Sequence, residues 1–378
     1  MPDQLFCSNC SSSQRYPITH WQCPLCRGPL DWQTPRTFSR TDILTGRHFA
    51  WRYAAALPAI GSASPFGEME TPLTTIEIDG ATVLAKLDFL TPTGSFKDRG
   101  FAVLLGALAE IGVRHVVEDS SGNAAASIAA YAARASIPCT VFAPAAASPG
   151  KLIQATAYGA RVVRVSGSRS EVAKAAEDQH DDQRGVVYAS HNWHPFFIAG
   201  VATWAFETWE QLGYQAPGNV IVPVGSGSLA LGAHYAFALL KTSGEIQQLP
   251  RIFAAQPESC APIAAAIDQH APAIKEFDRQ PSIAEGASIA APVRGREVLA
   301  ALRKSGAGAV RATELEIIEA TLESARQGLY IEPTSALAVA AARKLLRSGT
   351  IRRSESTVLV LTGSGLKATE SIGDRLTS

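Results

Sequence analysis

The chain has 378 residues, of which 46% are hydrophobic, and its 34 basic side chains equal its 34 acidic side chains in number. This length is sufficient for two domains with substantial cores, and the balanced charge argues against nucleic acid or an anionic membrane surface as a partner. No apolar run approaches the ~18 residues that span a bilayer, and the polar first residues lack the pattern of a signal peptide. We therefore expect a soluble, cytoplasmic protein whose partner is a small molecule.

Two C-x2-C pairs lie near the start of the sequence and comprise Cys7, Cys10, Cys23 and Cys26. This spacing can bring four thiolates to one tetrahedral Zn²⁺, and it is typical of a structural zinc ribbon. A catalytic zinc is not expected, because four thiolates leave no open coordination position. The alternatives are two disulfides, which a reducing compartment disfavours, and a ribbon that no longer binds metal.

After the ribbon, short apolar strands alternate with amphipathic helices. We expect helices at 101–111 and 124–136, and strands at 82–90, 115–120, 139–144, 159–167, 185–190, 219–225, 251–256 and 357–363. This alternation predicts an α/β fold with mostly parallel sheets and helices on both faces. Ligands of such sheets bind where the strands end, so the candidate binding loops are 91–97, 119–123, 223–228 and 362–365.

Two of these loops carry residues suited to an anion and to a reactive amine. Lys97 follows a turn of glycine and hydroxyl residues in PTGSFKDRG, just before an apolar helix; taken alone, it would be read as a surface lysine. The second loop consists of Ser120, Ser121, Gly122 and Asn123 and precedes an alanine-rich helix. Its hydroxyls and helix-terminal amides suit a carboxylate or phosphate, although an ordinary N-cap would need only one of these residues.

A third loop follows an apolar strand and consists of Gly225, Ser226, Gly227 and Ser228. Glycines allow backbone amides to approach a phosphate, and serines add hydroxyl donors. The loop has neither a Walker lysine nor GxGxxG spacing, which argues against a nucleoside triphosphatase and a nicotinamide enzyme. A phosphate cradle, a second anion loop and one lysine together fit pyridoxal phosphate, whose aldehyde forms a Schiff base with lysine.

The sequence resembles the fold-type II pyridoxal-phosphate enzymes, and among them the threonine synthases. The resemblance rests on GEMETPL (67–73), PTGSFKDRG (92–100), EDSSGNAAASIAAYAARA (118–135), AYGARVVRVSG (157–167), VPVGSGSLALG (222–232), IEPTSALAVAA (331–341) and LTGSGLKA (361–368). These motifs stand in the family's order. The cysteine ribbon is similar to that of some threonine synthases and cysteate synthases.

This resemblance implies two αβα domains with parallel-rich sheets and the cofactor in the cleft between them, in addition to the ribbon-like segment. The implied limits are 1–35 for the ribbon, 36–97 and 205–378 for a large cofactor-binding domain, and 98–204 for a small substrate domain. The resemblance also implies a homodimer.

The resemblance assigns roles by position in this sequence. Lys97 would bind the cofactor covalently and take the substrate α-proton, and Asn123 would bond the phenolic oxygen of the cofactor. The residues that would hold the cofactor phosphate are Gly225, Ser226, Gly227 and Ser228. The residues that would bind substrate include Ser95, Ser120, Ser121, Gly122 and Asn123. Thr362 would face the pyridine nitrogen with a neutral hydroxyl, which favours elimination and replacement over transamination.

One stretch departs from the threonine synthase pattern. In HNWHPFFIAGVAT (191–203), Phe197 stands where threonine synthases carry an arginine that binds the phosphate of O-phosphohomoserine, and His194 stands where they carry an asparagine. Both positions remain candidate substrate contacts, but phenylalanine cannot supply the bidentate fork of arginine. Either another basic residue, such as His191, His194 or Lys151, binds the leaving phosphate, or the substrate differs.

The sequence therefore predicts a pyridoxal-phosphate-dependent carbon-oxygen lyase or synthase that acts on a small polar L-amino acid, closest to threonine synthase. The alternative is β-elimination or β-replacement on a hydroxy- or phospho-amino acid, as in serine/threonine dehydratases or cysteate synthases. A catalytically silent binding or regulatory homologue is the alternative from another class. The retained Lys97, Asn123, glycine loop and Thr362 argue against it.

Overall fold

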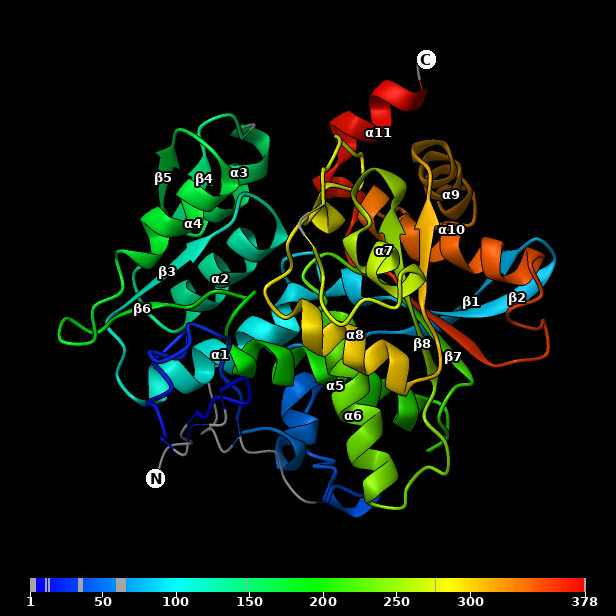
Figure 1. The fold of residues 1–378 in the computed structure, drawn as a ribbon, viewed down its shortest axis with the longest axis horizontal. Helices are drawn as coiled ribbons and strands as arrows, with labels where there is room; N and C mark the ends of the chain where they lie inside the picture. The colour runs from blue at the N-terminus through cyan, green and yellow to red at the C-terminus, as the bar shows by residue number, and fades with distance from the viewer. Residues whose placement is uncertain are drawn as a thin grey trace. The chain divides into compact units, whose positions relative to one another are not determined.

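The chain separates into two compact units. In the computed structural model the described residues are 5–10, 12, 14–32, 37–58, 66–147, 149–275 and 277–376. The first unit comprises Met1–Met69 and Lys97–Thr203, and the second comprises Glu70–Phe96 and Trp204–Ser378 (Figure 1). The domain limits expected from the sequence stay a prediction, and the limit between residues 35 and 36 lies outside the described residues.

The first unit contains a parallel four-stranded sheet in the order β5-β4-β3-β6. Its strands are β3 (His115–Asp119), β4 (Cys139–Pro144), β5 (Arg161–Val165) and β6 (Val186–Tyr188). Its helices are α1 (Lys97–Glu110), α2 (Asn123–Arg134), α3 (Pro149–Ala157) and α4 (Arg169–Glu177), with the 3-10 segments η1 (Arg40–Asp42) and η2 (Phe49–Ala56). Val117, Phe142 and Tyr188 of the sheet pack against Val172 and Ala176 of α4, so α4 covers one face. α2 also packs on β3 and β4, and burial between helices explains the apolar runs in these strands.

The second unit contains a six-stranded sheet in the order β1-β2-β10-β7-β8-β9, in which only β1 is antiparallel to its neighbour. Its strands are β1 (Leu73–Ile78), β2 (Ala81–Lys86), β7 (Asn219–Pro223), β8 (Arg251–Pro257), β9 (Ala309–Ala312) and β10 (Thr357–Val360). Asp79 and Gly80 both have positive φ angles, which is the geometry of a two-residue hairpin between β1 and β2. The alanine-rich helix α10 (Pro333–Arg347) packs on this sheet and supplies much of the core.

The remaining elements of the second unit are helices of 7 to 15 residues and 3-10 segments. They are α6 (Ser228–Thr242), α7 (Pro262–Asp268), α8 (Gly295–Lys304), α9 (Glu314–Arg326), α11 (Thr369–Leu376), η3 (Asp88–Leu90), η4 (Glu258–Cys260), η5 (Glu285–Ala287) and η6 (Gly365–Lys367). Helix α5 (Pro195–Gln211) begins in the first unit and ends in the second.

The predicted α/β class with parallel-rich sheets is confirmed, with differences at some element limits. The strand expected over 82–90 ends at Lys86, because residues 88–90 turn into η3. The helix expected at 101–111 already begins at Lys97, since Asp98, Arg99 and Gly100 are buried helical residues although their sequence looks like a polar loop. Strands β1 and β9 were not predicted; both lie at the edges of their sheet.

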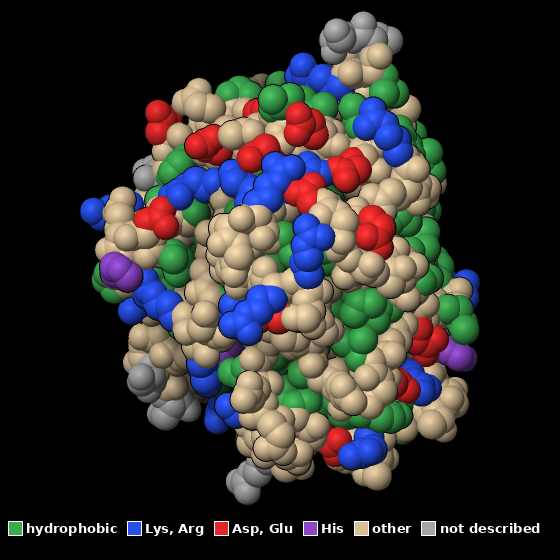
Figure 2. Space-filling view, turned by 90° about the vertical axis from the view of Figure 1, so that its right-hand side faces the viewer, with side chains coloured by type: hydrophobic (Ala, Val, Ile, Leu, Met, Phe, Trp, Pro, Cys, Tyr) green, Lys and Arg blue, Asp and Glu red, His purple; other side chains and the backbone are tan. Residues whose placement is uncertain are grey.

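The surface mixes charges of both signs. Figure 2 shows one face of the molecule, on which Lys and Arg side chains lie among Asp and Glu side chains. Ion pairs of this kind include Arg347 with Asp79 and Lys344 with Glu316. None of the helices in the described ranges combines the length and apolar character that a bilayer crossing requires.

Candidate functional site

Lys97 is fixed by buried neighbours on its own helix. It is the first residue of α1, and its Nζ lies 5.4 Å from the centre of the Phe197 ring. The fully buried Asp98 accepts a hydrogen bond of 2.6 Å from Ser127 of α2. Arg99 is also fully buried and donates to the hydroxyl of Thr203. Because buried charges must be paired to be tolerated, these two contacts hold the start of α1, and with it Lys97, in place.

The segment that leads to Lys97 pairs with the loop that contains Thr362. The N–H group of Phe96 donates to the Thr362 carbonyl at 2.9 Å, and the N–H group of Ser364 donates to the Gly94 carbonyl at 2.9 Å. Ser95 is fully buried, and its hydroxyl oxygen has no hydrogen-bond partner within the described residues. A buried, unpartnered hydroxyl two residues from the lysine fits a bound ligand group.

Ser335 orients the loop of Thr362. Its Oγ accepts hydrogen bonds from the backbone N–H groups of Thr362 and Gly363, at 2.9 and 2.7 Å, and lies 3.0 Å from the Thr362 hydroxyl oxygen. Ser335 is fully buried and Thr362 is 1% exposed. The loop therefore presents a neutral hydroxyl that is held by another hydroxyl.

The glycine loop between β7 and α6 requires glycine at two positions. Gly227 has a φ of 91° and is the N-cap of α6, and a Cβ there would overlap Val298. A Cβ on Gly225 would lie 2.7 Å from the carbonyl oxygen of Gly286. Both positions therefore require glycine, and the loop ends at the N-terminus of a 15-residue helix, where amides favour an anion. These donors fit the phosphate of pyridoxal phosphate.

The loop of residues 120–122 leads into α2 at Asn123. Gly122 is the N-cap of α2 and has no side chain to accept the first helical amides. The Ser120 hydroxyl accepts a hydrogen bond of 3.3 Å from the Gly122 N–H group, and Ser121 is half-buried. Hydroxyls and helix-terminal amides thus meet at one strand end, which is the donor set that a carboxylate requires.

Phe197 and His194 are fully buried. The Phe197 ring packs edge to face on Phe101 and His191, with ring centres 5.0 and 5.8 Å apart, and a Cβ on Gly100 would overlap it. His194 Nε2 lies 2.8 Å from the carbonyl oxygen of Ile18, and its Nδ1 accepts from the Phe196 N–H group. Phe197 thus contacts the lysine through its ring face, while His194 joins the N-terminal segment to α5.

His191 pairs with a buried carboxylate. Its Nδ1 lies 2.8 Å from Glu118 Oε1, and its backbone N–H group donates to Glu118 Oε2 at 3.1 Å. Burial, together with the positive charge of Lys97, lowers the pKa of His191 well below its usual value. Burial raises the pKa of Glu118 to about 7, against the opposing effect of the His191 N–H group. His191 is therefore neutral and engaged, not a free cation for a phosphate.

The predicted residues fall into two groups. The first unit contains Lys97, Ser120, Ser121, Gly122, Asn123, His194 and Phe197, and the second contains Ser95, Gly225, Ser226, Gly227, Ser228 and Thr362. Sequence reasoning missed Ser335 and the partner of His191. Ser335 lies in the motif IEPTSALAVAA, and Glu118 is the first residue of EDSSGN. The sequence does not indicate that Ser335 pairs with Thr362, 27 positions away, or that Glu118 pairs with His191, 73 positions away.

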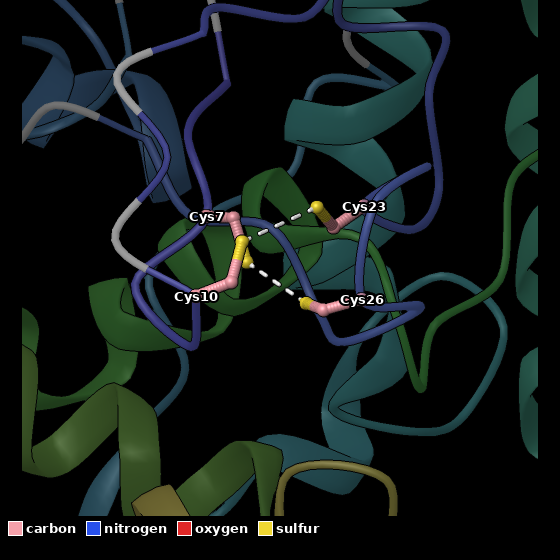
Figure 3. A group of neighbouring side chains, drawn as sticks. All are labelled: Cys7, Cys10, Cys23 and Cys26. Carbon is pink, nitrogen blue, oxygen red and sulfur yellow. Dashed lines mark hydrogen bonds between the residues drawn. The ribbon is translucent and has the colours of Figure 1, made fainter.

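The four N-terminal cysteines converge as the spacing predicts (Figure 3). Their sulfur atoms all lie within 4.8 Å of one another, with Cys7 and Cys26 3.5 Å apart and Cys10 and Cys23 3.8 Å apart. The four cysteines are free in this structure, and their sulfur separations are close to the roughly 3.8 Å between sulfurs that are each about 2.3 Å from one tetrahedral Zn²⁺. Burial raises the pKa of the Cys7 thiol to about 12, and a bound metal cation would favour its thiolate form.

Trp21 anchors this ribbon to the first unit. It lies two residues before Cys23 and packs edge to face on Tyr188 and Trp193, with ring centres 5.2 and 5.0 Å apart. It is 8% exposed and belongs to the same apolar cluster as Val117. The ribbon is therefore part of the core beside strands β3 and β6.

Comparisons with known proteins identify the family of this chain. The family model described as pyridoxal-phosphate dependent enzyme matches residues 65–363. Threonine synthase of Methanosarcina acetivorans is 31% identical over 380 residues, covering 98% of this chain and 93% of the relative. Threonine synthase of Methanocaldococcus jannaschii is 35% identical over 326 residues, covering 84% of this chain and 80% of the relative.

Solved structures give the same result for the fold. Maize serine racemase matches with a TM-score of 0.66 at 22% identity, covering 82% of this chain and 93% of that one. The processed form of threonine deaminase isoform 2 from Solanum lycopersicum matches with a TM-score of 0.67 at 20% identity, covering 81% and 83%. The predicted resemblance to threonine synthases and to the fold-type II enzymes is confirmed. The chain belongs to the family of pyridoxal-phosphate dependent enzymes.

Proposed function

We propose that this protein eliminates a β or γ substituent from a small polar L-amino acid, and that its reaction is closest to that of threonine synthase. In that reaction O-phosphohomoserine and water give threonine and phosphate. The observation that carries the proposal is the similarity to threonine synthases over nearly the whole chain.

The cofactor would be held by a small set of residues. Lys97 would bind it through the side-chain amine, Asn123 would bond its phenolic oxygen, and Thr362 would face its ring nitrogen. The amides and hydroxyls of Gly225, Ser226, Gly227 and Ser228 would hold its phosphate. The obligatory glycines of that loop and the unpartnered hydroxyl of Ser95 support this assignment.

The chain's own residues would then handle one proton and one carboxylate. When bound, pyridoxal phosphate supplies an electron sink that acidifies the substrate α-proton. The Lys97 amine would take that proton at Nζ, while Ser120, Ser121 and Gly122 would hold the substrate carboxylate. The Thr362 hydroxyl, held by Ser335, is a neutral partner for the ring nitrogen. This neutrality favours loss of a leaving group over transamination.

A second candidate is β-elimination or β-replacement on a hydroxy- or phospho-amino acid. The buried Phe197, in place of the phosphate-binding arginine of threonine synthases, favours it. Phenylalanine offers no donor to a phosphate oxygen, so the leaving group must be bound elsewhere or must not be phosphate. A catalytically silent homologue would explain this departure but not the retention of the lysine and the glycine loop.

One spectroscopic experiment separates these candidates. We expect the purified protein to show the visible absorbance band of lysine-bound cofactor, Lys97→Ala to lack it, and the exposed-lysine control Lys174→Ala to keep it. Phosphate release from O-phosphohomoserine supports the threonine synthase reaction. Keto acid release from serine, threonine or O-phosphoserine supports the second candidate. No band after added pyridoxal phosphate overturns both and supports the silent homologue.

We also propose that Cys7, Cys10, Cys23 and Cys26 hold one structural Zn²⁺, that the protein works in the cytoplasm, and that it is a homodimer. The clustered sulfur atoms support the zinc site. The dimer follows from the resemblance alone, and the location is an expectation from the sequence alone. Sedimentation velocity at micromolar protein measures the assembly, and a single species with the mass of one chain would contradict the dimer.

A further inference from the structure

Arg169 lies at the strand end that begins the proposed substrate loop. It is the first residue of α4, whose N-cap Ser168 accepts a hydrogen bond from Glu171. The Nη2 group of Arg169 donates to the backbone carbonyl of Asp119 and to its carboxylate. Asp119 ends β3 and directly precedes Ser120. The guanidinium is therefore tied to the first peptide of the loop assigned to the substrate.

Only one part of this guanidinium is used by the protein. Asp119 is 2% exposed and also accepts hydrogen bonds from the hydroxyls of Tyr188 and Ser190. The Arg169 side chain is 42% exposed, and within the described residues its Nε and Nη1 groups donate no hydrogen bond. A guanidinium has five N–H donors in a rigid fork, which can bind one anion on one edge and a second on another.

The other basic candidates are already engaged. His191 is paired with Glu118 and is held neutral. His194 uses both ring nitrogens within the protein, and Phe197 is apolar and fully buried. The side chain of Lys151 is not among those that the structure describes. Arg169 is also paired, with Asp119, but its side chain is 42% exposed and its Nε and Nη1 groups have no partner among the described residues.

We propose that Arg169 is a specificity-determining residue that binds an anionic group on the substrate side chain, a phosphate or a second carboxylate. This inference rests on the proposed function and deepens it, because it defines the substrate class as an amino acid with a negatively charged side-chain substituent. The buried Asp119 keeps the guanidinium in position, and the Asp119 carboxylate also accepts hydrogen bonds from the hydroxyls of Tyr188 and Ser190.

The test compares anionic and neutral substrates of similar shape on the holoenzyme. The pairs are O-phosphohomoserine with homoserine and O-phosphoserine with serine, each measured by kcat/KM and by titration of the cofactor absorbance. We expect Arg169→Gln to lower the preference for the anionic member by about tenfold or more, because charge-assisted hydrogen bonds are lost. Arg169→Lys keeps the charge beside Asp119 but loses the fork, so its preference should fall between those of the wild type and Arg169→Gln.

Arg164→Gln is the matched control. Arg164 lies in the same unit and donates to the carbonyls of Ala145 and Ala147 at 3.0 and 2.8 Å, with no carboxylate partner among the described residues. It should leave the preference unchanged. If Arg169→Gln lowers kcat/KM for both members of a pair equally, or changes neither, the inference is overturned. If the wild type binds the cofactor but turns over none of the four amino acids, the proposed function is overturned. The dissociation constants from the absorbance titrations then test Arg169: the inference predicts that Arg169→Gln weakens binding of the anionic member of each pair selectively, and an equal effect or no effect on both members overturns it.

Discussion

Glu118 and His191 form a buried pair beside the proposed catalytic lysine, joined by a contact of 2.8 Å between Oε1 and Nδ1 and by a second contact through the backbone. Glu118 is fully buried and His191 is 8% exposed. Burial raises the pKa of Glu118 and lowers that of His191, and the charge of Lys97 lowers both. The positive charge of Lys97 thus acts on both members of the pair.

We predict that single substitutions in this pair give opposite pH dependences of stability. In His191→Gln, burial still raises the pKa of Glu118 from 4.5 to about 7. The contribution of Glu118 to the free energy of unfolding is therefore fully present below pH 4.5 and is lost as the pH rises through 7. In Glu118→Gln, burial keeps the pKa of His191 below 6.5, so stability is present above pH 6.5 and is lost as pH falls. Urea unfolding across about pH 4 to 8 should show slopes of up to about 1.4 kcal/mol per pH unit. Slopes of the same sign would contradict the pairing.

Ser335→Ala should weaken cofactor binding as well as stability. The substitution removes the acceptor of the Thr362 and Gly363 N–H groups, and leaving such groups unpaired costs about 1–3 kcal/mol. Fluorescence titration with pyridoxal phosphate and thermal unfolding measure the two effects. Ser324→Ala is the control, because Ser324 is similarly buried but donates only to a carbonyl of its own helix. Unchanged cofactor affinity in Ser335→Ala would remove Ser335 from the site.

Lys86→Met should be strongly destabilising. Lys86 is fully buried, and its Nζ lies 2.5 Å from Glu207 Oε1 and 2.7 Å from the Thr71 carbonyl oxygen. Removing one partner of a buried ion pair costs about 3–5 kcal/mol. The double variant Lys86→Met with Glu207→Leu should recover much of that loss in urea unfolding. A double variant no more stable than Lys86→Met would show that the charge pair is not the cause.

Alanine variants at the two glycines where α1 crosses α5 should differ in whether a second substitution restores their stability. A Cβ on Gly200 would overlap the backbone carbonyl of Arg99, whereas a Cβ on Gly100 would overlap the Phe197 ring. We expect both alanine variants to lose about 1–3 kcal/mol or more, measured by thermal unfolding. Combining Gly100→Ala with Phe197→Leu should restore stability, but Phe197→Leu should not rescue Gly200→Ala. Gly150→Ala, where a Cβ meets nothing within 4 Å, should be neutral.

Removal of zinc should loosen the first unit and not the ribbon alone. Elemental analysis should give about one Zn²⁺ per chain, and Cys10→Ala and Cys26→Ala should lose it. Because Trp21 packs on Tyr188 and Trp193, a chelator should also shift tryptophan emission toward that of a solvated indole. Cys139→Ala, which alters a buried strand cysteine far from the cluster in sequence, should keep the metal. A metal-free wild type would contradict the site.

The features that could be predicted from the sequence are those that short motifs encode. Parallel strands could be predicted because burial between helices makes them apolar runs. The phosphate-binding role of Gly225 and Gly227 stays a prediction, although the structure shows that both positions require glycine. The four cysteines converge because their spacing leaves few other geometries. In each case the residues that define the feature are neighbours along the chain.

The features that were missed depend on residues far apart in the chain. Glu118 and His191 are separated by 73 positions, and Lys86 and Glu207 by 121. Such polar residues look like surface residues until the fold buries them as pairs. The start of α1 was placed four residues late for the same reason, because the burial of Asp98 and Arg99 comes from tertiary partners.

The position of Trp21 has a consequence for how this protein could change in evolution. A zinc ribbon at the end of a chain is usually regarded as a cassette that recombination can add or delete. Here the indole of Trp21 fills part of the apolar cluster between β3, β6 and α4, so deleting the ribbon would also remove a piece of the first unit's interior. A variant without the four cysteines would therefore still need the tryptophan to fill the interior of the first unit.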